Sequence, residues 1–94
     1  MKDSEKEKII QICKNNDISM IGIFGSTARG DSKMDSDIDI LIKLSKPKSL
    51  LSVVKMERML SEALGRKVDL VTEKAISPYL RDRVFNELMV IYEA

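Results

Sequence analysis

Two short stretches decide the fold: Gly25-Ser26-Thr27-Ala28-Arg29-Gly30 and, after a polar loop, Asp37-Ile38-Asp39-Ile40-Leu41-Ile42. The first is typical of a glycine turn that opens a short helix, where backbone N–H groups and a serine hydroxyl bind phosphate oxygens. The second is typical of a strand, in which alternation places both aspartates on one side and the isoleucines on the other. A phosphate-binding turn beside two carboxylates suits a divalent metal and a nucleoside triphosphate. The pattern therefore indicates a transferase that uses a nucleotide.

Two other motifs share part of this pattern and are excluded by the residues that follow. The two glycines of residues 25–30 have the spacing of a Walker A loop, but Asp31 stands where that loop needs lysine. The three acids of residues 35–39 resemble the start of an EF-hand. Ile40 then occupies the glycine position and Lys46 the glutamate position, so calcium sensing is rejected as well.

Length and composition narrow the class of protein. Ninety-four residues are enough for one small domain, and we expect residues 1–94 to form a single domain without a second, substrate-binding one. Sixteen basic and fifteen acidic residues nearly cancel, so we expect neither direct nucleic-acid binding nor attraction to a membrane. A single cysteine, Cys13, and no long apolar N-terminal run favour the cytoplasm. The absence of histidine excludes histidine bases and histidine metal sites.

Apolar spacing and the glycine and proline positions predict alternating helices and strands. Ser4 with Glu7 fits a capping box at the start of the first helix, and Gly22 inside a strand indicates that another element packs close to its backbone. Asp69, in the third strand, adds another carboxylate. The predicted strands lie in residues 19–24, 37–44, 66–72 and 89–92, and the predicted helices in residues 4–14, 26–30, 49–64 and 78–88.

Gly25-Ser26, followed after ten residues by Asp37-x-Asp39, resembles the nucleotidyltransferases of the DNA polymerase beta superfamily. The form Gly-Ser-x-Ala-Arg-Gly with Ser-Asp-x-Asp is similar to the minimal nucleotidyltransferase branch, with the motif proper in residues 25–39 and Asp69 as its extension. This resemblance implies an α+β, two-layer fold: a small mixed sheet with helices packed on one face, like a polymerase palm.

The resemblance also implies roles for individual residues. Asp37 and Asp39 would hold two Mg²⁺ ions, while Gly25 and Ser26 would bind the triphosphate of ATP. Asp69 would be the third catalytic acid, joining one metal and helping to deprotonate the acceptor hydroxyl. Arg29 is a candidate for phosphate contact on its own chemistry, with pairing to a surface acid as the alternative.

The branch that the chain resembles is typically paired with a small helical HEPN protein, often an RNase toxin. The resemblance therefore implies an antitoxin that transfers AMP from ATP to a tyrosine of that toxin, as a homo- or hetero-oligomer. Two alternatives stay open: a non-catalytic module that masks its partner, and transfer to a small molecule such as an aminoglycoside. Lys43, Lys46 and Lys48 are candidates for an acceptor or partner surface, with solvated loop lysines as the alternative.

Overall fold

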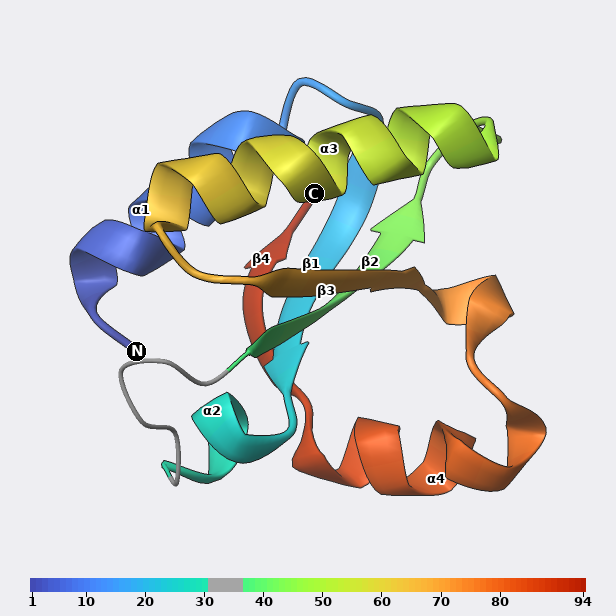
Figure 1. Cartoon of the computed structure of the whole chain (residues 1–94). Coiled ribbons are helices and arrows are strands. Elements are labelled where there is room, and N and C mark those ends of the chain that lie inside the picture. Colours follow the sequence, from blue (N-terminus) through green and yellow to red (C-terminus); the bar gives the residue numbers. More distant parts are fainter. Residues whose placement is uncertain (31–36) are drawn as a thin grey trace.

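Four strands form one sheet, and its two central strands border the motif: one ends directly before Gly25, and the other contains Asp39 (Figure 1). The computed structural model of the chain describes residues 1–30 and 37–94; the loop prediction for residues 31–36 lies outside them. In chain order the elements are α1 (Asp3–Cys13), β1 (Ile18–Phe24), α2 (Ser26–Arg29), β2 (Ile38–Leu44), α3 (Leu50–Leu64), β3 (Val68–Thr72), the short 3₁₀ helix η1 (Glu73–Ala75), α4 (Pro78–Glu87) and β4 (Met89–Glu93).

The sheet is mixed, with the strand order β3-β2-β1-β4. β1 runs antiparallel to both of its neighbours, β2 and β4. β2 and β3 are parallel, and α3 makes the crossover that two parallel strands require. The mixed sheet expected from the resemblance is therefore confirmed.

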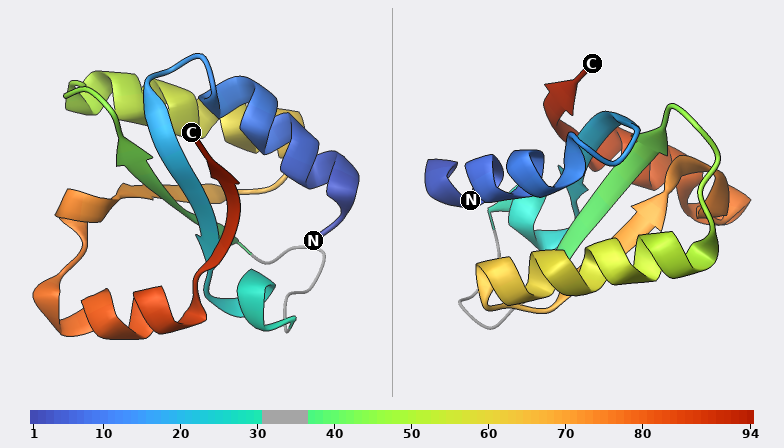
Figure 2. Two further views of the ribbon diagram at one scale, coloured as in Figure 1. Left: turned by 180° about the vertical axis from the view of Figure 1, so that it is seen from behind. Right: turned by 90° about the horizontal axis from the view of Figure 1, so that it is seen from above.

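One face of the sheet forms the hydrophobic core. In β2 the isoleucines at alternate positions are fully buried, as the predicted alternation requires. α1 and α3 cover this face and lie side by side across it in both views (Figures 1 and 2). The buried cluster consists of Ile9, Cys13, Ile18, Ile21, Ile23, Ile38, Ile40, Ile42, Met56, Leu60, Val68 and Leu70.

α3 has the end signals that its sequence predicts. The Ser49 side chain accepts a hydrogen bond of 3.2 Å from the Ser52 backbone N–H, which fixes the first turn. Gly65 ends the helix with a φ of 65°, in the left-handed region that glycine adopts without a steric penalty. At 15 residues α3 is the longest helix in the described ranges, and none of those helices is long and apolar enough to cross a membrane.

α4 departs from the expectation that all helices pack on one face. Its start is as predicted, with Ser77 as N-cap and Pro78 at the first position. A Cβ placed on Gly22 would lie 2.5 Å from Leu88 Cδ1, directly after α4, so the close approach expected at this glycine is real. Gly22 alternates with Ile21 and Ile23, which face the core. The C-terminal end of α4 therefore packs on the opposite face from α1 and α3.

The start of α1 was also predicted differently. The helix begins at Asp3, and the Glu5 carboxylate accepts a hydrogen bond of 3.2 Å from the Lys2 backbone N–H. Glu5 thus makes the acidic half of a capping box two residues earlier than the predicted Ser4 and Glu7 pair. Ser4 lies inside the first turn, so its predicted capping role is wrong.

Candidate active site

The predicted site residues meet at the end of the sheet where β1 ends and β2 begins. Phe24 is the register partner of Asp39, so the turn at Gly25 follows directly beside that carboxylate. A Cβ on Gly25 would overlap with Asp39 Oδ2, and Gly25 has a φ of 74°, which favours glycine. Only a residue without a side chain allows the backbone to lie this close to Asp39.

Asp39 and Asp69 are neighbours on adjacent strands. The parallel register of β2 and β3 pairs them directly, so both side chains leave the sheet on the same face. This is the face opposite the core, because the residues on either side of each aspartate are buried isoleucine, valine or leucine. Both aspartates are partly exposed, which leaves them accessible to a ligand.

Two side chains of α3 hold β3 beside Asp69. Glu57 Oε2 accepts a hydrogen bond of 2.8 Å from the Leu70 backbone N–H. One helical turn later, Ser61 Oγ accepts one of 3.0 Å from the Val68 N–H. Val68 and Leu70 are the residues immediately before and after Asp69, so the backbone that carries this acid is anchored from both sides.

Asp37 precedes β2 and has a cation beside it. Its Oδ2 lies 3.8 Å from Lys67 Nζ, with the lysine side chain 71% and the aspartate side chain 45% exposed. The two segments are also joined through the backbone, because the Ile38 N–H donates to the Lys67 carbonyl oxygen at 3.0 Å. The sequence analysis did not identify Lys67 as a residue of the site. The signal that could have found it is its position two residues before Asp69, on the same side of an extended chain.

α2 follows Gly25 and contains the other predicted phosphate-binding residues. Ser26 is its first residue, and Gly30 ends it with a φ of 78°. Arg29 is its last residue, and the predicted contact of its side chain lies outside what the structure describes. Between them Thr27 is 4% exposed, and its buried hydroxyl has no hydrogen-bond partner among residues 1–30 and 37–94. A buried hydroxyl without a hydrogen-bond partner is uncommon in folded proteins.

Oxygen donors at this site suit Mg²⁺, which binds carboxylates and phosphate oxygens. The parallel register gives Asp39 and Asp69 as an adjacent pair, while Asp37 is engaged with Lys67. Within the part of the chain that the structure describes, no three acidic or cysteine side chains come close enough together to hold a metal ion. The chemistry of the donors fits the predicted metal, but the three-acid ligand set stays a prediction.

The sheet is mixed, the Gly25 turn lies against Asp39, and Asp39 pairs with Asp69 on the strand that α3 connects to β2. This arrangement is the one expected of a nucleotidyltransferase. The comparison with known families agrees with this class. The chain belongs to the Polymerase beta nucleotidyltransferase family, whose pattern matches residues 7–94. The family predicted from residues 25–39 is therefore confirmed.

Individual relatives cover most of the chain. MJ0435 of Methanocaldococcus jannaschii, provisionally named a protein adenylyltransferase, is 45% identical over 82 residues, which are 87% of this chain and 88% of that protein. The protein adenylyltransferase MntA of Thermococcus cleftensis is 38% identical over 71 residues, 76% of this chain and 72% of its own. A crystal structure of a toxin-antitoxin with AMP-PNP has a TM-score of 0.85 at 26% identity, covering 95% of this chain and 73% of that one.

Proposed function

We propose that this chain is a protein adenylyltransferase that moves AMP from ATP to a hydroxyl of a partner protein. The observation that carries the proposal is the register pair of Asp39 and Asp69, with the Gly25 backbone against Asp39. Two relatives that cover most of the chain bear the name protein adenylyltransferase, which supports the acceptor class.

The residues divide the chemistry between them. The backbone N–H groups after Gly25 and the Ser26 hydroxyl hold the triphosphate oxygens. Asp37, Asp39 and Asp69 would hold two Mg²⁺ ions, which would supply positive charge that offsets the charge on the entering and leaving oxygens. Asp69 accepts the proton of the acceptor hydroxyl as its oxygen attacks the α-phosphorus. The bond from that phosphorus to the bridging oxygen of the β-phosphate breaks, and diphosphate leaves. Arg29 is a further phosphate contact in this scheme.

The partner in this proposal is a HEPN toxin, and the acceptor is one of its tyrosines. The support is the similarity to a toxin-antitoxin structure that was solved with an ATP analogue. A second support is the minimal nucleotidyltransferase motif of residues 25–39. AMP on the toxin would block its activity, so the chain would act as an antitoxin in a hetero-oligomer.

A second candidate function is masking of the partner without chemistry. One observation favours it: Asp37 pairs with Lys67 instead of joining the other two acids. The two candidates differ in whether neutralisation of the toxin requires the carboxylates. Transfer to a small molecule has no comparable support, since two relatives that align over most of the chain carry the name protein adenylyltransferase.

The experiment combines the purified chain, Mg²⁺, a purified HEPN protein and ATP labelled at the α- or the γ-phosphate. We expect only the α-label on the HEPN protein, and we expect its loss with Asp37→Asn/Asp39→Asn. Asp82→Asn, at an exposed position of α4, is the matched control and should transfer normally. Transfer of the γ-label would contradict the mechanism. Full neutralisation of the toxin by the Asp37→Asn/Asp39→Asn variant would favour masking.

A further inference from the structure

A groove of about 780 Å³ begins at the end of the sheet opposite the acids. Its walls are the end of β2 with the 45–48 loop, the first turns of α3, and the end of β3 with η1. Along β2 the groove begins at Lys43, four residues after Asp39, which is roughly 13 Å at about 3.3 Å per residue. Along β3 it reaches Leu70, the residue directly after Asp69. The groove therefore extends from the far end of β2 to the residue next to the third acid.

Apolar side chains line the inner part of the groove and continue onto the exposed surface of α3. Leu50 lines the groove and is 77% exposed, and Leu51 beside it is 81% exposed. Large apolar side chains gathered around a concave surface are typical of sites that bind another molecule. The large aliphatic residues of the lining are Leu44, Leu50, Val53, Leu70 and Val71, and the smaller apolar residues are Pro47 and Ala75.

Positive charge is concentrated at the rim of this groove. The lining holds four lysines and one glutamate, although the whole chain has a net charge of only +1. Lys43 pairs with Glu73 at 3.1 Å, and Lys48 pairs with Asp17 at 3.4 Å. The other two lysines, Lys46 and Lys74, have no ion-pair partner among the residues for which contacts are described.

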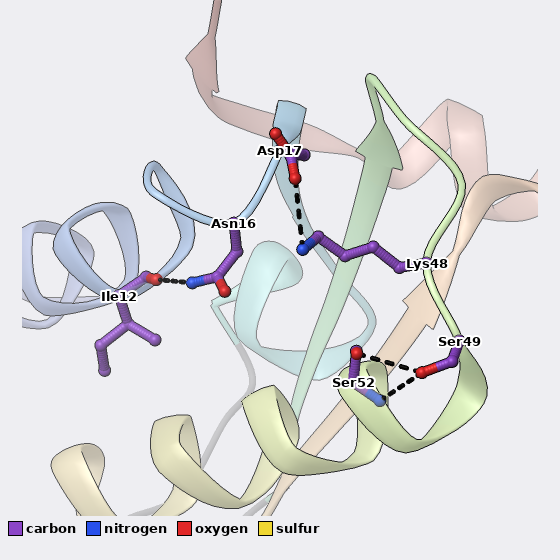
Figure 3. Close-up of polar contacts among 6 residues, drawn as sticks. All are labelled: Ile12, Asn16, Asp17, Lys48, Ser49 and Ser52. Atoms are coloured by element: carbon purple, nitrogen blue, oxygen red, sulfur yellow. Dashed lines mark hydrogen bonds and ion pairs between the residues drawn. The ribbon is translucent and has the colours of Figure 1, made fainter.

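The loop that forms one wall is held in place by Asp17. The Asp17 carbonyl oxygen accepts a hydrogen bond of 2.8 Å from the Ser45 N–H, and its carboxylate pairs with Lys48. Figure 3 shows Lys48 extending across to Asp17, with the Ser49 and Ser52 cap of α3 directly below. Asp17 has a φ of 57°, a conformation that aspartate adopts more readily than most residues. A wall fixed in this way need not become ordered when a ligand binds, which favours binding.

We infer that this groove docks an acidic and apolar segment of the partner protein that carries the acceptor hydroxyl. The inference rests on the proposed function. Apolar side chains of the segment would cover Leu50 and Val53, and its carboxylates would meet Lys46 and Lys74. Complementary charge selects the partner and speeds association, while the apolar contact slows dissociation. Docking would then hold the partner in the groove while its hydroxyl reaches the acids.

The test is the affinity for a purified HEPN protein, measured by calorimetry without ATP so that no transfer takes place. We expect Lys46→Glu/Lys74→Glu to weaken binding at least tenfold and Lys46→Gln/Lys74→Gln to weaken it less. Lys2→Glu/Lys8→Glu makes the same change of charge at two exposed positions, one directly before α1 and one within it. Lys8 lies near Ala63, at the opposite end of α3 from the groove, so affinity should stay within twofold. Leu50→Ser/Leu51→Ser should also weaken binding, with a salt dependence like that of the unchanged chain.

The outcomes separate the docking site from the function. If the unchanged chain binds the HEPN protein and the groove variants bind equally well, the groove proposal is overturned while the proposed function stands. If the unchanged chain does not bind it at all, both fall. An RNA oligonucleotide that binds through Lys46 and Lys74, with HEPN affinity unaffected by their reversal, would also overturn the docking proposal. Far-UV circular dichroism of each variant checks that the fold is kept.

Discussion

The backbone of Gly25 lies against the carboxylate of Asp39, with no room for a methyl group between them. Gly25→Ala should therefore push the carboxylate out of position and strain the backbone, which has φ 74° and ψ −152°. We expect a loss of roughly 1–3 kcal/mol of unfolding free energy, because this region is essentially restricted to glycine. Transfer of AMP should fall roughly 100-fold, as a displaced catalytic group costs about that much.

Gly65→Ala separates these two effects. Gly65 also has a positive φ, but a Cβ there would have no neighbour within 4 Å. The substitution should cost about 1–2 kcal/mol of unfolding free energy and leave transfer unchanged. Thermal unfolding and transfer of α-labelled AMP measure the two quantities. Equal losses of activity in both variants would show that strain, and not the contact with Asp39, matters.

Lys67 is expected to compete with a divalent cation for Asp37. The two side chains are 3.8 Å apart and largely exposed, so their attraction is worth at most about 1 kcal/mol. Lys67→Met should therefore tighten the binding of Mn²⁺ by roughly two- to fivefold, as measured by electron paramagnetic resonance without nucleotide. Lys55→Met, at an exposed position of α3, is the control. Weaker binding in the Lys67 variant would mean that the lysine helps to build the site.

Glu57 is expected to act through the strand that carries Asp69. Glu57→Ala leaves the Leu70 N–H without its acceptor and should cost about 2 kcal/mol of unfolding free energy. Transfer should fall with little change in the KM for ATP, because Asp69 has no assigned contact with the triphosphate. Glu57→Gln keeps an acceptor oxygen and should restore most of both losses.

The control for this change lies on the same helix. Glu62→Ala alters an exposed position of α3 and should change neither stability nor transfer appreciably. A Glu57→Ala variant that unfolds more easily but transfers AMP at the normal rate would limit Glu57 to a role in stability.

Cys13 links stability to alkaline pH. Burial raises the pKa of the Cys13 thiol from 9.0 to about 12. Between those values the unfolded chain has lost this proton while the folded chain keeps it. The unfolding free energy should therefore be unaffected below about pH 9 and fall between about pH 9 and 12, by up to about 1.4 kcal/mol per unit. Cys13→Ala should remove this slope in denaturant titrations, and a slope that persists would point to other groups.

Much of the central sheet could be predicted from the sequence because its signals are local. β1 and β2 begin within one residue of their predicted positions, since a short apolar run followed by Gly25 marks β1 and alternating isoleucines mark β2. The close contact at Gly22 was expected because a glycine inside a strand is also a local signal. The family follows from the motif in residues 25–39. Which residue fills the space at Gly22 depends on the path of the chain 66 positions later, where Leu88 follows α4.

What could not be predicted depends on how separate segments pair. The partnership of Asp39 with Asp69 needs the parallel register of β2 and β3, which local patterns do not specify. The same register brings Lys67 to Asp37. The face taken by α4 depends on the space at Gly22, and the first turn of α1 depends on a Glu5 contact that competes with the Ser4 cap. The roles of the three aspartates stay predictions.

The hydrogen bonds that Glu57 and Ser61 accept from β3 decide whether another chain can pair with this edge of the sheet. β3 is an outer strand of the sheet, and outer strands present free N–H groups to which another extended chain can add. At Val68 and Leu70 those groups are already taken by side chains of the chain's own helix. The border of the sheet next to the acids is thereby closed to strand addition, so a partner's segment must approach Asp69 from the open face and cannot extend the sheet there.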